Sequence, residues 1–292
     1  MRSIVKESIP LNDEYWDMFI EPKRNLLDLR LGDLWRARDL VMLFVWRDFV
    51  SYYKQTILGP LWYIIQPILT TVVFTFIFGS VAKLPTGGLP QFLFYLSGTV
   101  VWSYFAACIT KTADTFITNT QLFGKVYFPR LAVPVSILIS NLITFAIQFF
   151  LFLAFMGYFA LRGNLLHPNW WMLITPLLVV MMAGLGLGFG IIISSLTTKY
   201  RDLRFLVTFG VTLLMYATPA ILPLSSFPQR FQWIILANPL TPIMETFRYA
   251  FLGGGGTVNL SDLAYSFGFM LVVVIVGAVI FNRVEATFMD TV

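Results

Sequence analysis

The chain of 292 residues is 58% hydrophobic and only 12% charged, and its mean hydropathy is +0.77. This apolar excess excludes a soluble domain of ordinary composition and indicates an integral membrane protein. The net charge of +5 reflects membrane topology and attraction to anionic headgroups, so it is no sign of nucleic-acid binding.

The first 58 residues are expected to form a separate unit. Residues 1–32 are polar and of mixed charge, without the apolar stretch of a cleavable signal peptide, and predict a cytoplasmic arm. Residues 33–58 predict an amphipathic helix in the plane of the membrane interface, with Arg36, Arg47 and Lys54 on its polar face. The expected apolar face consists of Leu34, Trp35, Val41, Met42, Val45, Trp46, Phe49, Tyr52 and Tyr53.

Six runs without charge follow in residues 59–292, where Gly59-Pro60 separates the interface helix from the first run. Each run is near or above the ~20 residues that cross the hydrocarbon core, and in lipid such runs must be helical. The predicted fold class is therefore an all-α membrane protein with six transmembrane helices. The runs are residues 61–82, 92–110, 133–161, 171–196, 205–224 and 263–281.

The basic residues predict which side of the membrane each loop occupies. The two termini, the loop at 114–132 with Lys111, and the loop at 197–205 contain 16 of the 20 lysines and arginines. By the positive-inside rule these segments are cytoplasmic. An even number of spans is consistent with both termini on that side.

The loop at 114–132 is the strongest candidate for contact with a partner. Asn119 is suited to cap a short helix that begins near Gln121 and ends before Pro129. This helix leaves two aromatic rings and a leucine on a water-facing loop. Docking into a partner protein explains that patch better than contact with lipid headgroups, which remains the alternative.

The fourth run carries Gly184, Gly186, Gly188 and Gly190. These glycines form two overlapping pairs of small residues four positions apart, a pattern that lets another helix approach closely. We therefore expect tight helix packing along this run.

The long connection at 225–262 contains two apolar pieces, residues 231–237 and 243–252, each too short to cross a bilayer. We expect two half-helices in the outer leaflet, joined by a hinge at 238–242. Irregular backbone at that depth requires protein or a water-filled cavity beside it. The segment is therefore a candidate gate.

No Asp, Glu, Lys, Arg or His lies within the six runs, so the chain offers no obvious group for coupling to an ion gradient. Its nearest match to a Walker motif fails, because Val126 follows Gly124-Lys125 and Asn119 replaces the first glycine. Clustered carboxylates and activated nucleophiles are also missing, and the single His167 cannot form a metal site. We conclude that another subunit supplies the energy.

Several stretches resemble the membrane subunit of the ABC-2 type exporters of O-antigen, capsular polysaccharide or teichoic acid. The resemblance covers about residues 30–292, and only Met289 departs slightly from the expected pattern. The matching stretches are residues 46–49 (WRDF), 52–62 (YYKQTILGPLW), 127–130 (YFPR), 200–203 (YRDL), 238–240 (NPL) and 284–290 (VEATFMD).

The resemblance implies a homodimer in the bacterial inner membrane that binds two copies of a separate ATPase, the subunit that holds ATP and magnesium. The substrate would be a polysaccharide linked to a polyprenyl diphosphate and moved outward. Arg36, Arg47 and Lys54 could contact its diphosphate, or could only anchor the interface helix. The implied ATPase-coupling residues are Asn119, Gln121, Leu122, Phe123, Lys125, Tyr127, Arg130, Tyr200, Arg201 and Asp202.

Two further sets of residues are expected to act on the glycan. Aromatic rings offer sliding contacts to the apolar faces of sugars, and the candidates are Phe74, Phe78, Trp102, Tyr104 and Tyr216. The candidate gate residues are Leu236, Asn238, Pro239, Pro242 and Ile243.

Two other classes of protein remain open. An ATP-independent secondary flippase for lipid-linked glycans is disfavoured by the absence of charge within the runs. A membrane-embedded acyl- or glycosyltransferase is disfavoured by the single histidine and the lack of a carboxylate cluster.

Overall fold

The computed structural model describes residues 31–54, 57–119, 122, 128–164, 166–197, 200 and 202–288, and contains no strand among them. The main helices are α1 (Leu31–Arg36), α2 (Arg38–Lys54), α3 (Trp62–Phe74), α4 (Gln91–Ala113), α5 (Thr115–Thr118), α7 (Ala132–Leu161), α8 (Thr175–Thr197), α9 (Leu203–Tyr216), α10 (Gln229–Leu236), α11 (Leu240–Leu252) and α12 (Leu260–Phe288). Shorter turns are η2 (Gly59–Leu61), η3 (Thr75–Val81), η4 (Trp170–Ile174) and η5 (Leu224–Ser226).

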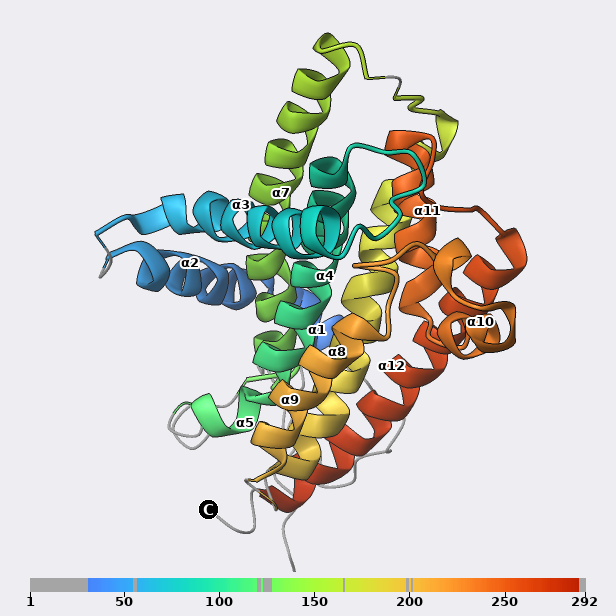
Figure 1. Ribbon diagram of the computed structural model, residues 1–292. Coiled ribbons are helices and arrows are strands. Elements are labelled where there is room, and N and C mark those ends of the chain that lie inside the picture. The colour runs from blue at the N-terminus through green and yellow to red at the C-terminus, as the bar shows by residue number, and fades with distance from the viewer. Residues whose placement is uncertain are drawn as a thin grey trace, which may run out of the picture.

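Four long helices, α4, α7, α8 and α12, form the body of the molecule (Figure 1). α8 packs extensively against both α4 and α12, and α4 packs against α7 on its other side. The main apolar core lies along α4. In an 18-residue stretch of α4, 78% of the residues are buried, the highest share of any long helix described. We call the two ends of this body the α5 end and the α11 end, after the short helices found there.

The glycines of α8 face two different helices, which confirms the expected close packing. A Cβ at Gly188 would lie 2.8 Å from Val273 Cγ1 on α12. A Cβ at Gly186 would lie 2.5 Å from Cys108 Cβ on α4. One glycine pair thus admits α12 and the other admits α4, so that α8 can touch both along its length.

The predicted interface segment is helical as α1 and α2, interrupted at Ala37. Of its predicted apolar face, Val41 and Val45 are buried together with Phe44, whereas Met42 and Trp46 are each 62% exposed. Its place in the membrane interface stays a prediction. α2 lies across the long axis of the body (Figure 1), as a helix in the interface plane would.

The break at Gly59-Pro60 is confirmed. Gly59 adopts a φ of +49°, which favours glycine, and Pro60 lies in the first turn of η2. The first predicted span follows as α3 and η3, the latter a π-helical turn. This segment also runs across the body in Figure 1. It is little buried, because only 17% of the residues in an 18-residue stretch of it are buried.

Five helices are long and apolar enough to cross a membrane. They are Gly59–Val81, Gln91–Ala113, Ala132–Leu161, Trp170–Thr197 and Leu260–Val284. The predicted fifth run, 205–224, is helical only as far as Tyr216, where the 14-residue α9 ends. At 1.5 Å per residue α9 is about 21 Å long, which is short of the ~30 Å hydrocarbon core.

The two predicted half-helices are present as α10 and α11. The hinge between them is shorter than expected, because α11 already begins at Leu240. Thr241 and Pro242 therefore belong to its first turn, where a proline is tolerated since the N–H groups there lack helical partners. α11 ends at Gly253, whose left-handed φ of +71° favours a glycine.

We expect Gly188→Ala to destabilise the protein, because the new methyl group would press on Val273 of α12. Overpacking of this kind costs about 1–3 kcal/mol. Thermal unfolding of the detergent-purified protein, followed by fluorescence, measures the loss. Gly268→Ala is the matched control, since nothing lies within 4 Å of a Cβ there. Equal melting temperatures for Gly188→Ala and the wild type would contradict the packing assigned to α8.

Candidate functional site

The α5 end of the body contains a second, smaller apolar core. It is built from α2, α5, α7, α8, α12 and the segment before α7. Its buried residues are Val41, Phe44, Phe116, Phe128, Ala132, Val133, Ile137, Ile191, Ala278 and Phe281. This core lies where the sequence predicts contact with a partner, because it contains both ends of the loop at 114–132.

Two aromatic contacts anchor that loop at its two ends. Phe116 stacks on Phe281 of α12, with ring centroids 5.0 Å apart. Phe128 meets Phe44 of α2 edge to face at 5.7 Å. Both phenylalanines of the loop are buried. The loop is therefore attached to two helices that are far apart in sequence, and a displacement of the loop acts on both.

Polar contacts tie the same loop to α8 and α9. Asp114, at the junction of α4 and α5, forms an ion pair with Arg204 of α9, in which Asp114 Oδ2 lies 3.1 Å from Arg204 Nε. Thr197 Oγ1, in the last turn of α8, donates to the carbonyl of Ala113 at 3.3 Å. Because both contacts reach the end of α4, the α4–α5 junction connects three helices of the body.

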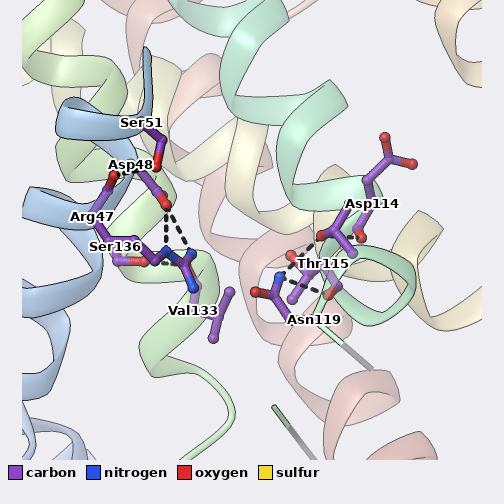
Figure 2. Close-up of polar contacts among 9 residues, drawn as sticks. Arg47, Asp48, Ser51, Asp114, Thr115, Asn119, Val133 and Ser136 are labelled. Carbon is purple, nitrogen blue, oxygen red and sulfur yellow. Dashed lines mark hydrogen bonds and ion pairs between the residues drawn. The ribbon is translucent and has the colours of Figure 1, made fainter. Parts of the chain in front are cut away.

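Asn119 lies at the end of α5 (Figure 2). Its Nδ2 donates to the carbonyl of Thr115 and to the hydroxyl of Thr118, both at 3.0 Å. Its own carbonyl accepts the N–H of Leu122 at 3.0 Å, as at the start of a further helical turn. The Asn119 side chain therefore caps the C-terminal end of α5, a role that the sequence did not indicate.

The other predicted coupling residues divide into two groups. Arg130 is buried within the α5 end, Leu122 is half-buried, and Tyr200 and Asp202 are exposed between α8 and α9. The remaining ones, Gln121, Phe123, Lys125, Tyr127 and Arg201, lie outside the described residues. The coupling roles of both groups stay predictions.

The predicted interface cations stand on the outside of α1 and α2. Arg36 and Lys54 are exposed. Arg47 donates from Nε and Nη2 to Oδ1 of its neighbour Asp48, at 2.9 and 2.8 Å, and this pair lies beside the start of α7 in Figure 2. The charge of Arg47 is thus already partly balanced within α2.

The predicted glycan-path aromatics form three separate groups. Phe74 and Phe78 contact each other, with centroids 5.5 Å apart, and both contact Tyr95. Trp102 and Tyr104 are buried in the main core. Tyr216 is 57% exposed at the end of α9. No ring contact joins these groups in the described part of the chain, so they do not form one continuous file here.

α11 closes the other end of the body. All but one of its residues are buried, against α4, α8, α12 and η4. Backbone bonds fix its last turn to the α7–α8 connection, where His167 and Asn169 donate to the carbonyls of Leu252 and Ala250. α10 is different, because its Trp233 is 68% exposed.

An arginine is fully buried within this closure. Arg248 of α11 donates from Nη2 to the carbonyl of Ala220 at 2.9 Å and from Nε to Ser97 Oγ of α4 at 3.3 Å. Its guanidinium lies 3.9 Å from the ring centroid of Phe94, a cation–π contact. Nη1 has no hydrogen-bond partner. Arg248 therefore joins α11 both to α4 and to the segment after α9.

Glu245 lies one helical turn before Arg248 and ties the rest of the candidate gate to α11. Its two carboxylate oxygens accept the N–H groups of Leu224, at 3.2 Å, and of Thr257, at 3.1 Å. Because Leu224 precedes α10 and Thr257 follows α11, the Glu245 side chain holds both ends of the candidate gate segment to α11.

Of the predicted gate residues, Pro239, Pro242 and Ile243 are buried, whereas Leu236 and Asn238 are half-buried. Asn238 Oδ1 accepts the N–H of Leu240 at 3.1 Å and so caps α11. The fully buried Ile243 belongs to the core rather than to an accessible surface.

The sequence analysis missed the four charged residues that hold the two ends, Asp114, Arg204, Glu245 and Arg248. Two signals were present. Arg204 directly precedes the run at 205–224 and Asp114 lies four positions after the run at 92–110, and Glu245 and Arg248 are three positions apart in a largely apolar segment.

Residues 39–252 match the ABC-2 type transporter family, and the chain belongs to this family. It is 30% identical to the O-antigen export system permease protein RfbA of Klebsiella pneumoniae over 86% of this chain and 94% of that protein. It is 28% identical to the O-antigen export system permease protein RfbA of Myxococcus xanthus over 75% of this chain and 82% of that protein. It is also 26% identical to the polysialic acid transport protein KpsM of Escherichia coli, over 82% of this chain and 91% of that protein.

We expect Arg248→Met to destabilise the α11 end, because it removes two hydrogen bonds and a cation–π contact while keeping a long side chain. Loss of a buried charged partner costs about 3–5 kcal/mol. Thermal unfolding of the purified protein, and reaction of a cysteine placed at the exposed Ser225 with an impermeant thiol reagent, measure the effect. Arg230→Met is the control, since Arg230 is exposed. The assigned tie fails if both variants melt and react alike.

Proposed function

We propose that this chain is the permease subunit of an ATP-driven exporter that moves a lipid-linked polysaccharide outward across the bacterial inner membrane. The observation that carries the proposal is its similarity, over nearly the full length of each protein, to permeases named for two polysaccharides, O-antigen and polysialic acid. Membership of the ABC-2 type family supports an ABC ATPase as the partner. That partner binds the ATP and magnesium, and this chain binds neither.

We further propose that the chain crosses the membrane six times with both termini in the cytoplasm, which requires α3 and η3, here lying across the body, to turn along it in the membrane. α8 ends and α9 begins at the α5 end, whereas α11 ends and α12 begins at the α11 end. The short α9, the turn at 217–223 and α11 together would make the crossing that α9 is too short to make alone. The basic loops assign the α5 end to the cytoplasm.

The α5 end is the proposed ATPase docking surface. The loop at 114–132 is fixed to α2 and α12 by Phe128 and Phe116, and to α9 by Asp114. A force applied to this loop therefore reaches helices on several sides of the body. This attachment supports a role in coupling for Asn119, Leu122 and the other predicted residues of the loop.

The gate and the substrate contacts complete the proposal. α10 and α11 would form the periplasmic gate, with Arg248 and Glu245 holding it closed. Arg36, Arg47 and Lys54 would meet the polyprenyl diphosphate at the inner leaflet. The five aromatic residues named above would contact the glycan once the path opens, since in this closed arrangement they are separate.

A homodimer with two ATPase copies fits the apolar faces that one chain leaves uncovered. On η3, Phe76 is 64% exposed, and on α9, Phe205 and Phe209 are 76% and 62% exposed. These faces can be covered by lipid or by a second copy. The alternative, an ATP-independent flippase, is not favoured, because the chain belongs to the ABC-2 type transporter family and resembles permeases of export systems.

Export should require the ATPase partner. The purified permease, reconstituted in liposomes with its partner ATPase, should move the lipid-linked glycan only when ATP and magnesium are supplied. A partner ATPase with its Walker lysine replaced is the control and should give no transport. Transport by the permease alone, driven by a pH difference, would reject the proposal in favour of the flippase.

Reversing one charge at the α4–α5 junction should weaken coupling without unfolding the protein. Arg204→Glu places two carboxylates where a partly exposed ion pair stands, and such a pair contributes at most ~1 kcal/mol to stability. We expect several-fold less copurified ATPase, and recovery in the swapped variant Asp114→Arg with Arg204→Asp. Arg162→Glu, at the α11 end, should behave as the wild type. Undiminished ATPase recovery with Arg204→Glu would exclude this junction from coupling.

A further inference from the structure

A cavity of about 340 Å³, lined by both polar and apolar groups, lies in the half of the molecule that includes the α5 end. Four helices form its walls: α2, α3, α4 and α7. None of its lining residues belongs to the candidate coupling, gate or aromatic sets. At about 30 Å³ for each water molecule, the cavity is the size of roughly eleven waters and reaches the lower range of small-ligand pockets.

The cavity has hydrogen-bonding groups of both kinds. Lys111 of α4 donates from Nζ to Asn141 Oδ1 at 2.8 Å, which fixes its position and leaves further donor capacity on the ammonium. Asp48 of α2 supplies carboxylate oxygens, and Ser51, Ser140 and Thr144 supply hydroxyl groups.

Aromatic rings complete the lining. Phe49 of α2 and Tyr63 of α3 both border the cavity. An aromatic ring offers an apolar face for the C–H groups of a pyranose, while charged and hydroxyl groups bond to its edge. A diphosphate fits less well, because Lys111 is the only cation among the lining residues of this cavity and the Asp48 carboxylate, although paired with Arg47, lines it as well.

We propose that this cavity is a carbohydrate-binding site for about one or two sugar units. One part of this assignment rests on the proposed function. If the chain exports a lipid-linked glycan, the sugars bound in this cavity are the units of that glycan nearest to its lipid link. Lys111 is in the last turn of α4, and Ser140 and Thr144 are within the first four turns of α7, which begins at the α5 end. The site therefore lies on the side from which a cytoplasmic glycan would enter.

Saturation-transfer NMR on the permease alone, in lipid nanodiscs free of alkyl-glucoside detergent, tests the site directly. The probes are the methyl glycosides of glucose, galactose and mannose, and N-acetylglucosamine. We expect transfer to at least one of them, weakened ~5-fold by Thr144→Val, as for the loss of one hydrogen bond. Lys111→Met should weaken it further. Thr208→Val, an exposed threonine on α9, is the matched control and should bind as the wild type.

Three results would overturn the proposal: no transfer to any of the four sugars, transfer unchanged by both cavity variants, or displacement of the bound sugar by inorganic pyrophosphate. The last result would mean that the cavity holds phosphate groups. Because binding is measured without ATPase, sugar binding without ATP-dependent export would refute the proposed function alone. Export without sugar binding would refute only the site.

Discussion

The close approach of α8 to two neighbours is the constraint on which the body of the molecule depends. In lipid no hydrophobic force drives one apolar helix onto another, so contact area must come from the shape of the helix surface. Glycines two positions apart along α8 point to opposite sides, and Gly186 admits α4 while Gly188 admits α12. A side chain at either position would separate α8 from one of these neighbours and leave the core along α4 without its wall.

The two ends of the body use another kind of contact. At each end, charged side chains bond to groups that are distant in sequence: Asp114 to Arg204 at the α5 end, and Arg248 to Ala220 and Ser97 at the α11 end. A polar contact can be broken and replaced by another partner, such as water, when two elements separate. Glycine-based packing has no such replacement and tolerates little displacement. We therefore expect the body to stay together and the polar contacts at its ends to be the ones that exchange.

The distribution of charge along the sequence predicted four of the long helices well, because α4, α7, α8 and α12 bury one another and need only be apolar. It did less well where neighbours decide the outcome. α9 ends at Tyr216 because the chain turns at 217–223 to bring Ala220 to Arg248. The direction of α3 depends on contacts with α4 and α7 that composition does not encode. The sequence predicts no role for Glu245 and Arg248, which lie in an expected half-helix, because their partners on α4, before α10 and after Gly253 cannot be recognised from sequence spacing.

α4 is the one helix that belongs to every candidate site. Lys111, in its last turn, borders the proposed sugar site, and Asp114, which follows it, holds the coupling loop. Ser97 lies fourteen residues before Lys111, or about 21 Å along the helix. Its hydroxyl oxygen accepts a hydrogen bond from the buried Arg248. That bond, at 3.3 Å, is longer than the 2.9 Å bond from the same guanidinium to Ala220, so it is the weaker of the two. A packed helix moves as a unit instead of absorbing a displacement locally. A shift of α4 that begins at the α5 end therefore acts on both contacts of Arg248 with α4, the bond to Ser97 and the cation–π contact with Phe94, while the bond to Ala220 and the two bonds of Glu245 still hold α11 to its neighbours.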